Sequence, residues 1–559
     1  MPLNQELFDL AIVGSAFGGS LMASIARRLG RSVVLIERGR HPRFAIGESS
    51  TPLTNLFLEQ LADRYDLPRI RAFSKWGTWQ KTHPKVAAGL KRGFSFYHHE
   101  LSTPWSPRPD RSNELLVAAS PNDDIADTHW YRPDFDAFLV EEAVSLGAIH
   151  VDQTELTAFS ERPDGIHLTG IRQGELMEFR ARFLVDASGP RGFLWKHLDL
   201  GEEPIEGFPD REALFTHFSG VRHWESCVTS ITPSAGDPSR SDPNPKAAPP
   251  FPIDDAALHH VFPGGWMWVL RFNNGISSAG FSVSPEIAGS VRLETGAPAW
   301  SRLLERLPSV AMQFADAQSI HPFVHLPSVA FRCPRCVGRR WALLPSAMGF
   351  LDPLLSTGFP LTLLGIRRLA GLLEQNAVPT PHSLEAYAAE TQANLTIAAE
   401  LVGALHHNLG RPTIFQALSM LYFAAASYSE TAIRLGKAKL APGFLLRDRP
   451  DFHGRLQSLC LQARMDPLPE SEFVSAITAA IGPVNVAGLN DPMRRNWYPV
   501  DLADLRNGRV KLDSSELEIT EMLRRCGLSS PSPAHGGITD RHRLSPNIAP
   551  HSGDRTGRV

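Results

Sequence analysis

The strongest constraint on the fold lies near the start of the chain, where residues 8–39 read FDLAIVGSAFGGSLMASIARRLGRSVVLIERG. The apolar run at residues 10–13 predicts a buried strand, and a glycine turn and a helix with one apolar face follow it. A second apolar run then ends at Glu37. This order of strand, turn, helix and strand predicts a βαβ unit, and such units build parallel sheets that helices cover.

The glycine turn has the spacing of a dinucleotide-binding loop. Gly14 permits the tight turn, Ala16 stands where a second glycine usually approaches a pyrophosphate, and Gly18 and Gly19 allow the helix to pack closely. Glu37 follows at the distance where an acidic residue accepts hydrogen bonds from a ribose. The segment therefore predicts a dinucleotide site at the start of the helix, the alternative being a purely structural turn.

Length and charge narrow the class of protein. A chain of 559 residues exceeds what one hydrophobic core usually fills, so we expect two or three structural units. The 56 basic and 59 acidic residues leave a net charge of -3 without long runs of one sign. This balance argues against nucleic acid or an anionic membrane as a partner. No secretory signal opens the chain and no apolar run reaches the length of a membrane span, so we expect a cytoplasmic protein.

Five cysteines are too few and too scattered for a disulfide framework, which also suits a reducing compartment. Cys333 and Cys336 form the pair in CPRC, which is half of a zinc knuckle. Because no second pair of cysteines or histidines stands at ligand spacing, we expect two loop thiols and no metal site.

The rest of the chain gives a coarse outline of its elements. We expect a helix over about 133–146, a strand that ends in a small-residue turn at 186–189, and a hairpin turn at 273–275. The segment 230–252 is too rich in Pro, Ser and Asp to pack, and we expect it to be flexible. A helical region follows over about 383–525, and the tail from 529 onward has the composition of a disordered segment.

Three further stretches carry residues of chemical interest. Lys91 and Arg92 precede an alternating aromatic strand, and their position alone favours two solvated bases at a strand edge. Trp266 and Trp268 lie two apart on a strand, so their side chains share one face, either as core packing or as a wall beside a cofactor. Residues 352–364 read DPLLSTGFPLTLL, whose Gly and Pro disfavour a helix interior, so we expect a ligand to approach the backbone there.

Taken in order, the motifs GSAFGG, HPRFAIGESSTP, GLKRGFSF, RPDFDAFL, VDASGPRGFL, GGWMWVL and GFLDPLLSTG resemble those of flavin-dependent halogenases, in the branch that acts on phenolic compounds. The resemblance spans residues 8–370. It implies an α/β fold: a Rossmann-like FAD-binding domain of the flavin monooxygenase/halogenase type, with an interleaved β-rich substrate region and a C-terminal helical region. The implied modules are 1–60, 125–200 and 335–375 for FAD, 61–124 and 201–334 for the substrate, 376–528 for the helices and 529–559 for the tail.

The resemblance also implies an activity. FADH2 from a separate NAD(P)H-dependent flavin reductase, O2 and chloride or bromide would give hypohalous acid, which a lysine delivers to a small phenolic substrate. By motif position that lysine is Lys91, with Lys75 and Lys85 as alternatives. Ser356 would hydrogen-bond near the lysine.

The remaining site residues follow from the same motif positions. The backbone N–H groups of Thr357 and Gly358 would hold the halide, and Trp266 and Trp268 would separate substrate from flavin. The implied cofactor contacts are Gly14, Ala16, Gly18, Gly19, Glu37, Arg38, Glu48, Ser49, Arg132, Asp186, Gly189, Ser346, Asp352 and Phe359.

Two departures from the family pattern leave alternatives open. Val269 and Leu270 follow the tryptophan motif where Ile-Pro is expected, and Ser346 replaces a carboxylate that commonly contacts the flavin. The alternatives are a FAD-dependent monooxygenase or other flavin oxidoreductase on the same fold, and a flavin-binding protein without turnover. The C-terminal helices either cover the substrate pocket or form a homodimer interface.

Overall fold

The computed structural model describes residues 6–231, 248–465 and 468–528. Most of the segment expected to be flexible, 230–252, and the whole tail from 529 onward lie outside the described residues. Among the helices that the structure describes, none combines the length and the apolarity that a transmembrane span requires.

The predicted βαβ unit forms the centre of the first sheet. It consists of β1 (Leu7–Val13), α1 (Phe17–Arg28) and β2 (Val33–Ile36), and β1 pairs in parallel with β2 and with β10 (Glu175–Asp186). β7 (Ile149–Val151) continues the parallel order beyond β2. The predicted architecture of this region is therefore confirmed.

An antiparallel meander widens the same sheet. The strand order is β7-β2-β1-β10-β9-β8, with β9 (Gly165–Arg172) and β8 (Thr154–Arg162) at one edge. The short strand β18 (Trp341–Leu343) pairs in parallel with the end of β10. β10 pairs in parallel with β1 and, at its end, with β18. The carboxyl end of β10 therefore lies at the same edge of the sheet as the glycine turn after β1 and the chain after β18.

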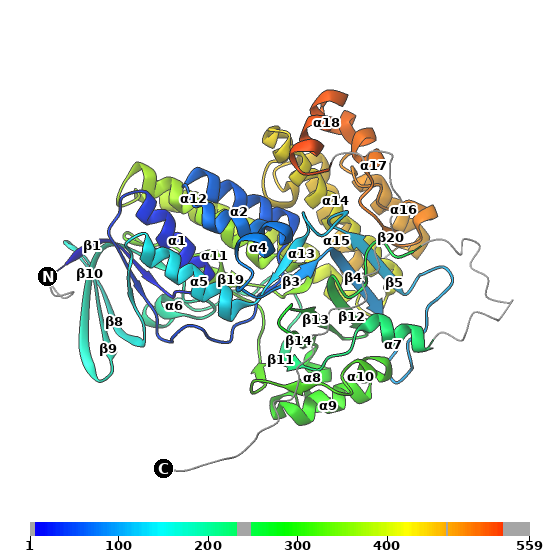
Figure 1. Ribbon diagram of the computed structural model, residues 1–559, viewed down its shortest axis with the longest axis horizontal. Helices are drawn as coiled ribbons and strands as arrows, with labels where there is room; N and C mark the ends of the chain where they lie inside the picture. The colour runs from blue at the N-terminus through cyan, green and yellow to red at the C-terminus, as the bar shows by residue number, and fades with distance from the viewer. Residues whose placement is uncertain (1–5, 232–247, 466–467, 529–559) are drawn as a thin grey trace, which may run out of the picture.

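Helices from distant parts of the chain cover the first sheet. α1 packs against α5 (Arg132–Ser145) and α12 (Gly358–Gln375), and α12 packs against α2 (Pro52–Arg64). Figure 1 shows these helices together on one side, with the meander of β8 and β9 projecting from the sheet. α2 begins at Pro52, where the Thr51 hydroxyl accepts a hydrogen bond from the backbone N–H of Thr54.

The second sheet is built from strands that are far apart in sequence. Its order is β15-β11-β14-β13-β12-β4-β5-β20, and β16 also pairs with β11. Its strands are β4 (Gly93–His98), β5 (Glu114–Ala118), β11 (Glu212–Ser219), β12 (Ala257–Phe262), β13 (Gly265–Arg271), β14 (Ile276–Val283), β15 (Gln318–Ser319), β16 (Val324–Leu326) and β20 (Trp497–Tyr498). β13 and β14 form the predicted hairpin.

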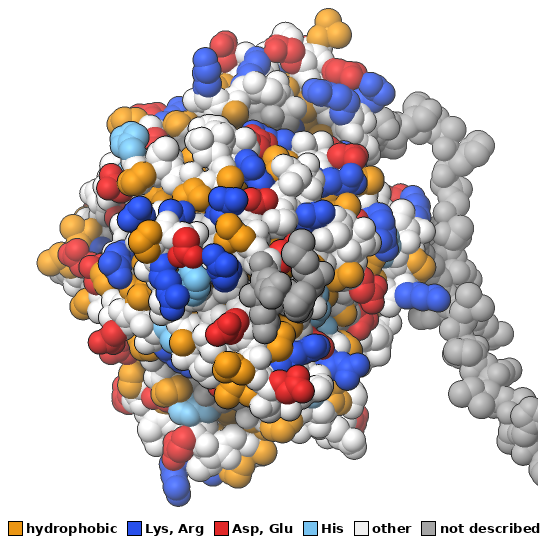
Figure 2. Space-filling view, turned by 90° about the vertical axis from the view of Figure 1, so that its left-hand side faces the viewer, with side chains coloured by type: hydrophobic (Ala, Val, Ile, Leu, Met, Phe, Trp, Pro, Cys, Tyr) orange, Lys and Arg blue, Asp and Glu red, His pale blue; other side chains and the backbone are white. Residues whose placement is uncertain are grey.

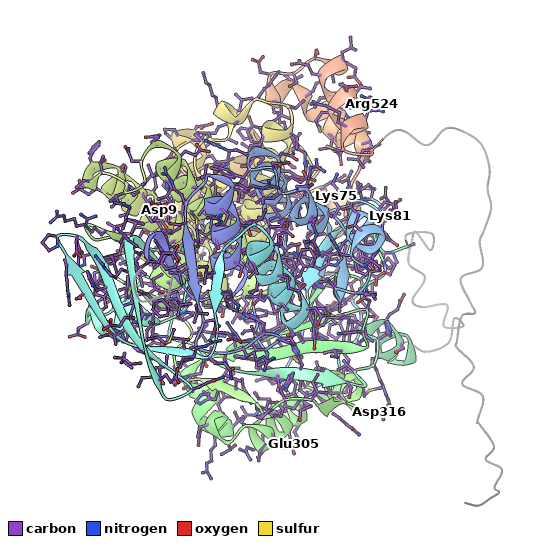
Figure 3. The ribbon with its side chains drawn as sticks, turned by 60° about the vertical axis from the view of Figure 1, so that its left-hand side comes forward. Asp9, Lys75, Lys81, Glu305, Asp316 and Arg524 are labelled. Carbon is purple, nitrogen blue, oxygen red and sulfur yellow. The ribbon has the colours of Figure 1, made fainter. Side chains whose placement is uncertain are left out.

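Two helical layers enclose the second sheet (Figure 1). One contains α7 (Trp224–Ile231), α8 (Pro285–Val291), α9 (Ala297–Glu305) and α10 (Pro308–Gln313). The other is the C-terminal region, with α13 (Pro381–His407), α14 (Pro412–Arg434), α15 (Pro450–Met465), α16 (Glu470–Ile481), α17 (Leu502–Asn507) and α18 (Glu516–Arg525). Figure 3 places the labelled Arg524 at one end of the molecule and Glu305 and Asp316 at the other.

The C-terminal region is helical as expected, with one difference. β20 pairs in parallel with β5, so this region contributes a strand to the second sheet as well as helices. A two-residue strand has no periodicity that a sequence pattern can reveal, which explains why it was not predicted. The mixed α/β fold class with a C-terminal helical region is confirmed, while the boundaries of the modules stay a prediction.

The surface carries charge of both signs. Figure 2 shows Lys and Arg side chains interspersed with Asp and Glu over one face of the molecule. This mixture agrees with the near balance of basic and acidic residues in the sequence.

Candidate functional site

The glycine turn after β1 has no room for side chains at two positions. A Cβ at Gly14, whose φ is +95°, would lie 2.5 Å from the carbonyl oxygen of Ala187, and a Cβ at Gly19 would lie 1.9 Å from that of Gly14. Ala16 caps α1 in an extended conformation and makes no side-chain cap hydrogen bond. The first N–H groups of α1 therefore lack side-chain acceptors, which suits a pyrophosphate.

Gly18 lies in the first turn of α1, and its Cβ position faces Leu344 at 3.3 Å. Glu37 follows directly after β2 and is only 7% exposed. Its carboxylate accepts hydrogen bonds from the backbone N–H groups of Ser15 (2.9 Å) and Gly39 (2.8 Å). Burial would raise the pKa of Glu37, but these hydrogen bonds and nearby Arg43 outweigh it and lower the pKa. An ionised carboxylate thus stands beside the glycine turn, and Arg38 next to it is exposed.

The turn after β10 forms the opposite side of this region. Asp186 accepts hydrogen bonds from the hydroxyl of Ser188 and from the backbone N–H of Leu194 (2.7 Å), so its carboxylate shapes the turn itself. Gly189 has φ +83° and open space around its Cβ position. The glycines and Glu37 fit a dinucleotide, while a direct contact from Asp186 or Gly189 to a cofactor stays a prediction.

The loop before α2 is fastened from two sides. Glu48 is buried and accepts a hydrogen bond from Nε2 of His217 at 2.7 Å. Arg132 pairs with Asp136 at 2.8 Å, and its Nη1 donates to the carbonyl oxygens of residues 46 and 47. Both side chains hold the loop in place, and their predicted contacts to the cofactor stay predictions.

Lys91 lies at the end of β3 (Ala88–Lys91) and has 0% exposure. Its Nζ donates to the hydroxyl of Ser49 at 2.8 Å and to the carbonyl oxygen of Ser50 at 2.6 Å. The ammonium also lies 3.9 Å from the ring centroid of Phe94. The reading of Lys91 and Arg92 as solvated bases is therefore wrong, since Arg92 is also largely buried and pairs with Asp123. The sequence position did not reveal that tertiary packing buries both side chains.

Asp127 is the partner that sequence reasoning missed. It opens β6 (Asp127–Trp130), which pairs antiparallel with β3 so that Lys91 and Asp127 are directly opposite. Burial lowers the pKa of Lys91 and raises the pKa of Asp127, and each group partly offsets the shift of the other. Both shifts favour the uncharged forms, which keeps a free amine accessible at Lys91.

The two alternative lysines differ from Lys91 in their surroundings. Lys75 is partly buried, with its Nζ 3.7 Å from a carboxylate oxygen of Glu59. Lys85 is exposed in a loop. Of these three lysines, Lys91 is the one that the protein removes fully from water.

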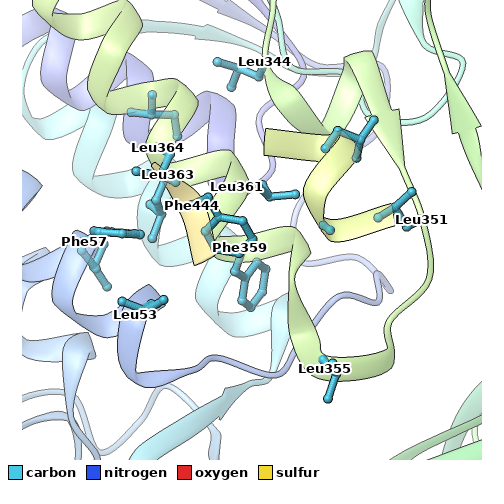
Figure 4. Packing of buried hydrophobic residues seen from close by; sticks show 14 of the residues in the cluster. Leu53, Phe57, Leu344, Leu351, Leu355, Phe359, Leu361, Leu363, Leu364 and Phe444 are labelled. Atoms are coloured by element: carbon cyan, nitrogen blue, oxygen red, sulfur yellow. The ribbon is translucent and has the colours of Figure 1, made fainter. Parts of the chain in front are cut away.

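The segment before α12 has an unusual backbone. Leu355 and Ser356 both adopt left-handed conformations, with φ values of 62° and 54°. Such conformations cost of order 1–3 kcal/mol per non-glycine residue, and they cluster at functional sites. α12 then begins at Gly358, and the first N–H groups of a helix have no acceptor within it. Figure 4 shows Leu355 on this loop and Phe359 in the first turn of the helix.

The predicted halide contacts at the start of α12 are not themselves observed. A Cβ at Gly358 would meet Phe350 at 3.6 Å, an ordinary van der Waals contact. The partners that the structure gives to Lys91 Nζ are Ser49 and Ser50, and a hydrogen bond to Ser356 is not among those of the described residues. The roles of Ser356, Thr357 and Gly358 stay predictions.

Two predicted cofactor residues of this segment contact other parts of the protein. Asp352 is fully buried and accepts hydrogen bonds from the hydroxyl of Ser282 (2.7 Å) and the backbone N–H of Leu354, with His406 Nε2 at 3.3 Å. Phe359 stacks on Trp130 with ring centroids 4.2 Å apart. These contacts fix the loop between the two sheets.

Ser346, the third predicted cofactor residue of this segment, lies half-buried in α11 (Pro345–Met348). Contacts of Ser346, Asp352 and Phe359 with a flavin stay predictions.

The two tryptophans of β13 lie side by side as predicted, with ring centroids 5.6 Å apart. Trp266 is fully buried and contacts the ring of His259 at 5.4 Å, and that imidazole stacks on Phe96 at 4.4 Å. A continuous aromatic layer therefore crosses β13, β12 and β4 on one face of the second sheet. A role in separating substrate from flavin stays a prediction.

A cavity of about 170 Å³ opens next to this layer, between β4, β5 and the C-terminal helices. Phe94 and Asp127 line it from one side, and Tyr422 and Phe423 of α14 line it from the other. Residues of α18 also reach it. Of the two roles considered for the C-terminal helices, the structure supports covering a pocket, and a homodimer interface stays a prediction.

The CPRC cysteines are buried thiols. Burial raises the pKa of Cys333 and of Cys336 to about 12. Within the described ranges 6–231, 248–465 and 468–528, no group of three or more His, Cys, Asp or Glu side chains is arranged to hold a metal ion.

The chain is similar to known halogenases. No protein-family model matches the chain. Monodechloroaminopyrrolnitrin halogenase PrnC of Pseudomonas fluorescens is 31% identical over 372 residues, which cover 66% of this chain and 61% of that protein. Tetracycline 7-halogenase of Kitasatospora aureofaciens is 30% identical over 360 residues, covering 63% and 60%. The chain thus spans about three fifths of the length of these curated relatives.

Solved structures agree in fold. The crystal structure of halogenase PltM in complex with phloroglucinol and FAD superposes with a TM-score of 0.74 at 24% identity, covering 87% of this chain and 99% of that one. CmlS, a flavin-dependent halogenase, superposes with a TM-score of 0.54 at 20% identity, covering 86% and 78%. The resemblance to flavin-dependent halogenases that the motifs indicate is confirmed by these relatives and neighbours.

Proposed function

We propose that this protein is a FAD-dependent halogenase that makes hypohalous acid from FADH2, O2 and chloride or bromide and transfers the halogen to an electron-rich, phenolic ring. The observation that carries the proposal is Lys91, a fully buried lysine whose Nζ lies 3.9 Å from the ring centroid of Phe94, a residue that lines the aromatic cavity. A buried ammonium without a function would be costly, because desolvation penalises its charge.

The residues around the glycine turn fit FAD. The open N-terminus of α1 would bind the pyrophosphate and the ionised Glu37 would accept hydrogen bonds from a ribose. When bound in reduced form, the flavin supplies two of the four electrons that reduce O2, and the halide supplies the other two as it becomes hypohalous acid. A separate NAD(P)H-dependent reductase would deliver the reduced cofactor.

Lys91 would then hold hypohalous acid by hydrogen bonding or carry the halogen as a chloramine. Ser49 and Ser50 orient its Nζ, and burial keeps the oxidant away from water. In the transfer, a ring carbon forms its bond to the halogen, the oxygen leaves as water, and the ring proton is lost. A phenol activates its own ring positions, so the protein need supply only position and the electrophile.

The halide would bind to the free N–H groups at the start of α12, from Thr357 and Gly358. Trp266 and Trp268 would keep the substrate from the flavin, which opposes direct oxygen transfer. We also propose that the enzyme works in the cytoplasm, because its five cysteines are too few and too scattered for a disulfide framework.

The test combines the purified protein with FAD, a flavin reductase, NADH, O2, chloride or bromide, and a panel of phenols, and follows products by mass spectrometry. We expect a halogen isotope pattern that changes when bromide replaces chloride. Oxygenated product without halogen would instead support a monooxygenase, and bound flavin without any product would support a protein that has lost turnover.

A further inference from the structure

One corner of the cavity carries polar groups that the steps above do not use. Asp127 is 4% exposed, and its Oδ1 accepts a hydrogen bond from Nδ2 of Asn55 at 2.6 Å. Its Oδ2 is buried without a hydrogen-bond partner among the described residues, as is Oδ1 of Asn55. Both residues line the cavity. A buried acceptor without a donor costs about 1–3 kcal/mol, so such an atom calls for an explanation.

The basic side chains near Asp127 pair with other groups and leave its Oδ2 without a hydrogen-bond donor in the described part of the chain. Arg434 of α14 also lines the cavity, but its guanidinium pairs with Glu430 at 2.8 Å and with Glu59 at 3.1 Å. Lys75 pairs with the same Glu59. Lys91, directly opposite on β3, directs its Nζ to Ser49 and Ser50. Asp127 lines the cavity, and because its Oδ2 is itself buried, a rotation of the carboxyl group would present this oxygen to a molecule there.

The other walls suit a flat ring. Phe94 and Phe423 meet edge to face with centroids 5.3 Å apart, and Tyr422 packs against Phe423 at 5.4 Å. Tyr498, from β20, closes the same cavity. Aromatic faces and edges favour aromatic partners in offset or perpendicular geometry. The Nζ of Lys91 lies over Phe94, so a ring in this cavity would lie near the proposed halogen carrier.

We propose that this cavity binds the aromatic substrate and that Asp127 accepts a hydrogen bond from an OH or NH group on its ring. The enzyme thereby selects aromatic compounds that carry a donor over analogues whose donor is alkylated. An alkylated analogue leaves Asp127 without a partner, and sites built to bind an OH or NH reject such analogues for that reason. The inference rests on the proposed function for the reaction, but binding to the cavity is measurable without turnover.

The test measures binding by isothermal titration calorimetry to the full-length protein with FAD present and no reductase. The probes are phloroglucinol, the ligand in the PltM structure, and its trimethyl ether, 1,3,5-trimethoxybenzene. We expect wild type to bind phloroglucinol at least about 10-fold more tightly than the ether, and Asp127→Asn to reduce this ratio by about 10-fold. Asp66→Asn, which removes an exposed carboxylate at a left-handed position that Asn tolerates, should leave the ratio unchanged.

A second variant tests the location even if Asp127→Asn does not fold. Ala426→Trp of α14 would fill the cavity, so we expect it to lose both probes while its melting temperature and FAD binding stay close to wild type. Equal binding of the two probes to wild type, an unchanged ratio in folded Asp127→Asn, or wild-type binding by Ala426→Trp would each overturn the inference. Failure of the halogenation assay with these binding results intact would reject the proposed function alone.

Discussion

The glycine turn of the first sheet and the cavity beside the second sheet are built in opposite ways. The turn is made within residues 14–37, largely from backbone groups and from positions where no side chain fits. The cavity joins side chains from Asn55, Asp127 and Glu430, which only the tertiary fold brings together. A site defined by its backbone tolerates few residue types at its positions. A site defined by side chains depends on specific hydrogen bonds, so substitutions there can change which ligand it selects.

The largest expected effect is the difference in stability between alanine substitutions at two helical glycines. Gly19→Ala in α1 would place a Cβ 1.9 Å from a backbone oxygen, so we expect a loss of about 3 kcal/mol in the free energy of unfolding and loss of FAD binding. Gly371→Ala in α12 meets nothing within 4 Å and should stabilise by about 0.5–1 kcal/mol. Denaturant unfolding and flavin fluorescence measure both. Equal stability of the two variants would contradict the view that the turn is fixed by its backbone.

A smaller effect is expected at the cavity. Asn55→Ala removes the 2.6 Å hydrogen bond to Asp127 and leaves a buried acceptor without its donor, which costs about 1–3 kcal/mol. We expect unfolding to become easier by about 2 kcal/mol while FAD binding is retained. Asn376→Ala, at the exposed end of α12, should change stability by less than about 0.5 kcal/mol. Loss of FAD binding in Asn55→Ala would show that the two regions are not independent.

The smallest effect concerns pH. His98 on β4 is buried, and burial together with Arg108 lowers its pKa from 6.5 to about 3. Because the unfolded state binds the proton more readily, stability is complete above pH 6.5 and is lost as the pH falls towards the folded-state pKa. We expect wild type to lose about 1 kcal/mol more than His98→Phe between pH 6.5 and 5.5. Parallel stability curves from thermal melts would contradict this assignment.

The sequence predicted the parts of the fold that local patterns encode. The βαβ unit, the hairpin of β13 and β14 and the C-terminal helices all follow from periodicity and turn residues within short windows. The pairing of Lys91 with Asp127 does not, because it needs the register of β3 against β6, and β6 is a four-residue strand. The same limit explains the solvated reading of Arg92, whose partner Asp123 is distant in sequence.

The same distinction between local patterns and tertiary contacts applies to the candidate site. The glycine spacing of the turn and the acidic Glu37 after the second strand were sufficient to predict a dinucleotide site from the sequence. Lys91 was identified through the family resemblance, since its position alone favoured the opposite reading. Asp127 had neither a motif nor a local pattern, and only the structure shows its place in the cavity wall and its carboxylate oxygen that has no partner among the described residues.

The central claim is that hypohalous acid is made in the flavin region and delivered by Lys91 to the cavity. The most direct measurement runs the reconstituted reaction of Lys91→Ala with a phenol and, separately, with a soluble β-diketone that traps free hypohalous acid. We expect the variant to bind FAD and still to halogenate the trap, while halogenation of the phenol falls by at least about 100-fold. Loss of both products with FAD still bound, or unchanged halogenation of the phenol, would contradict it.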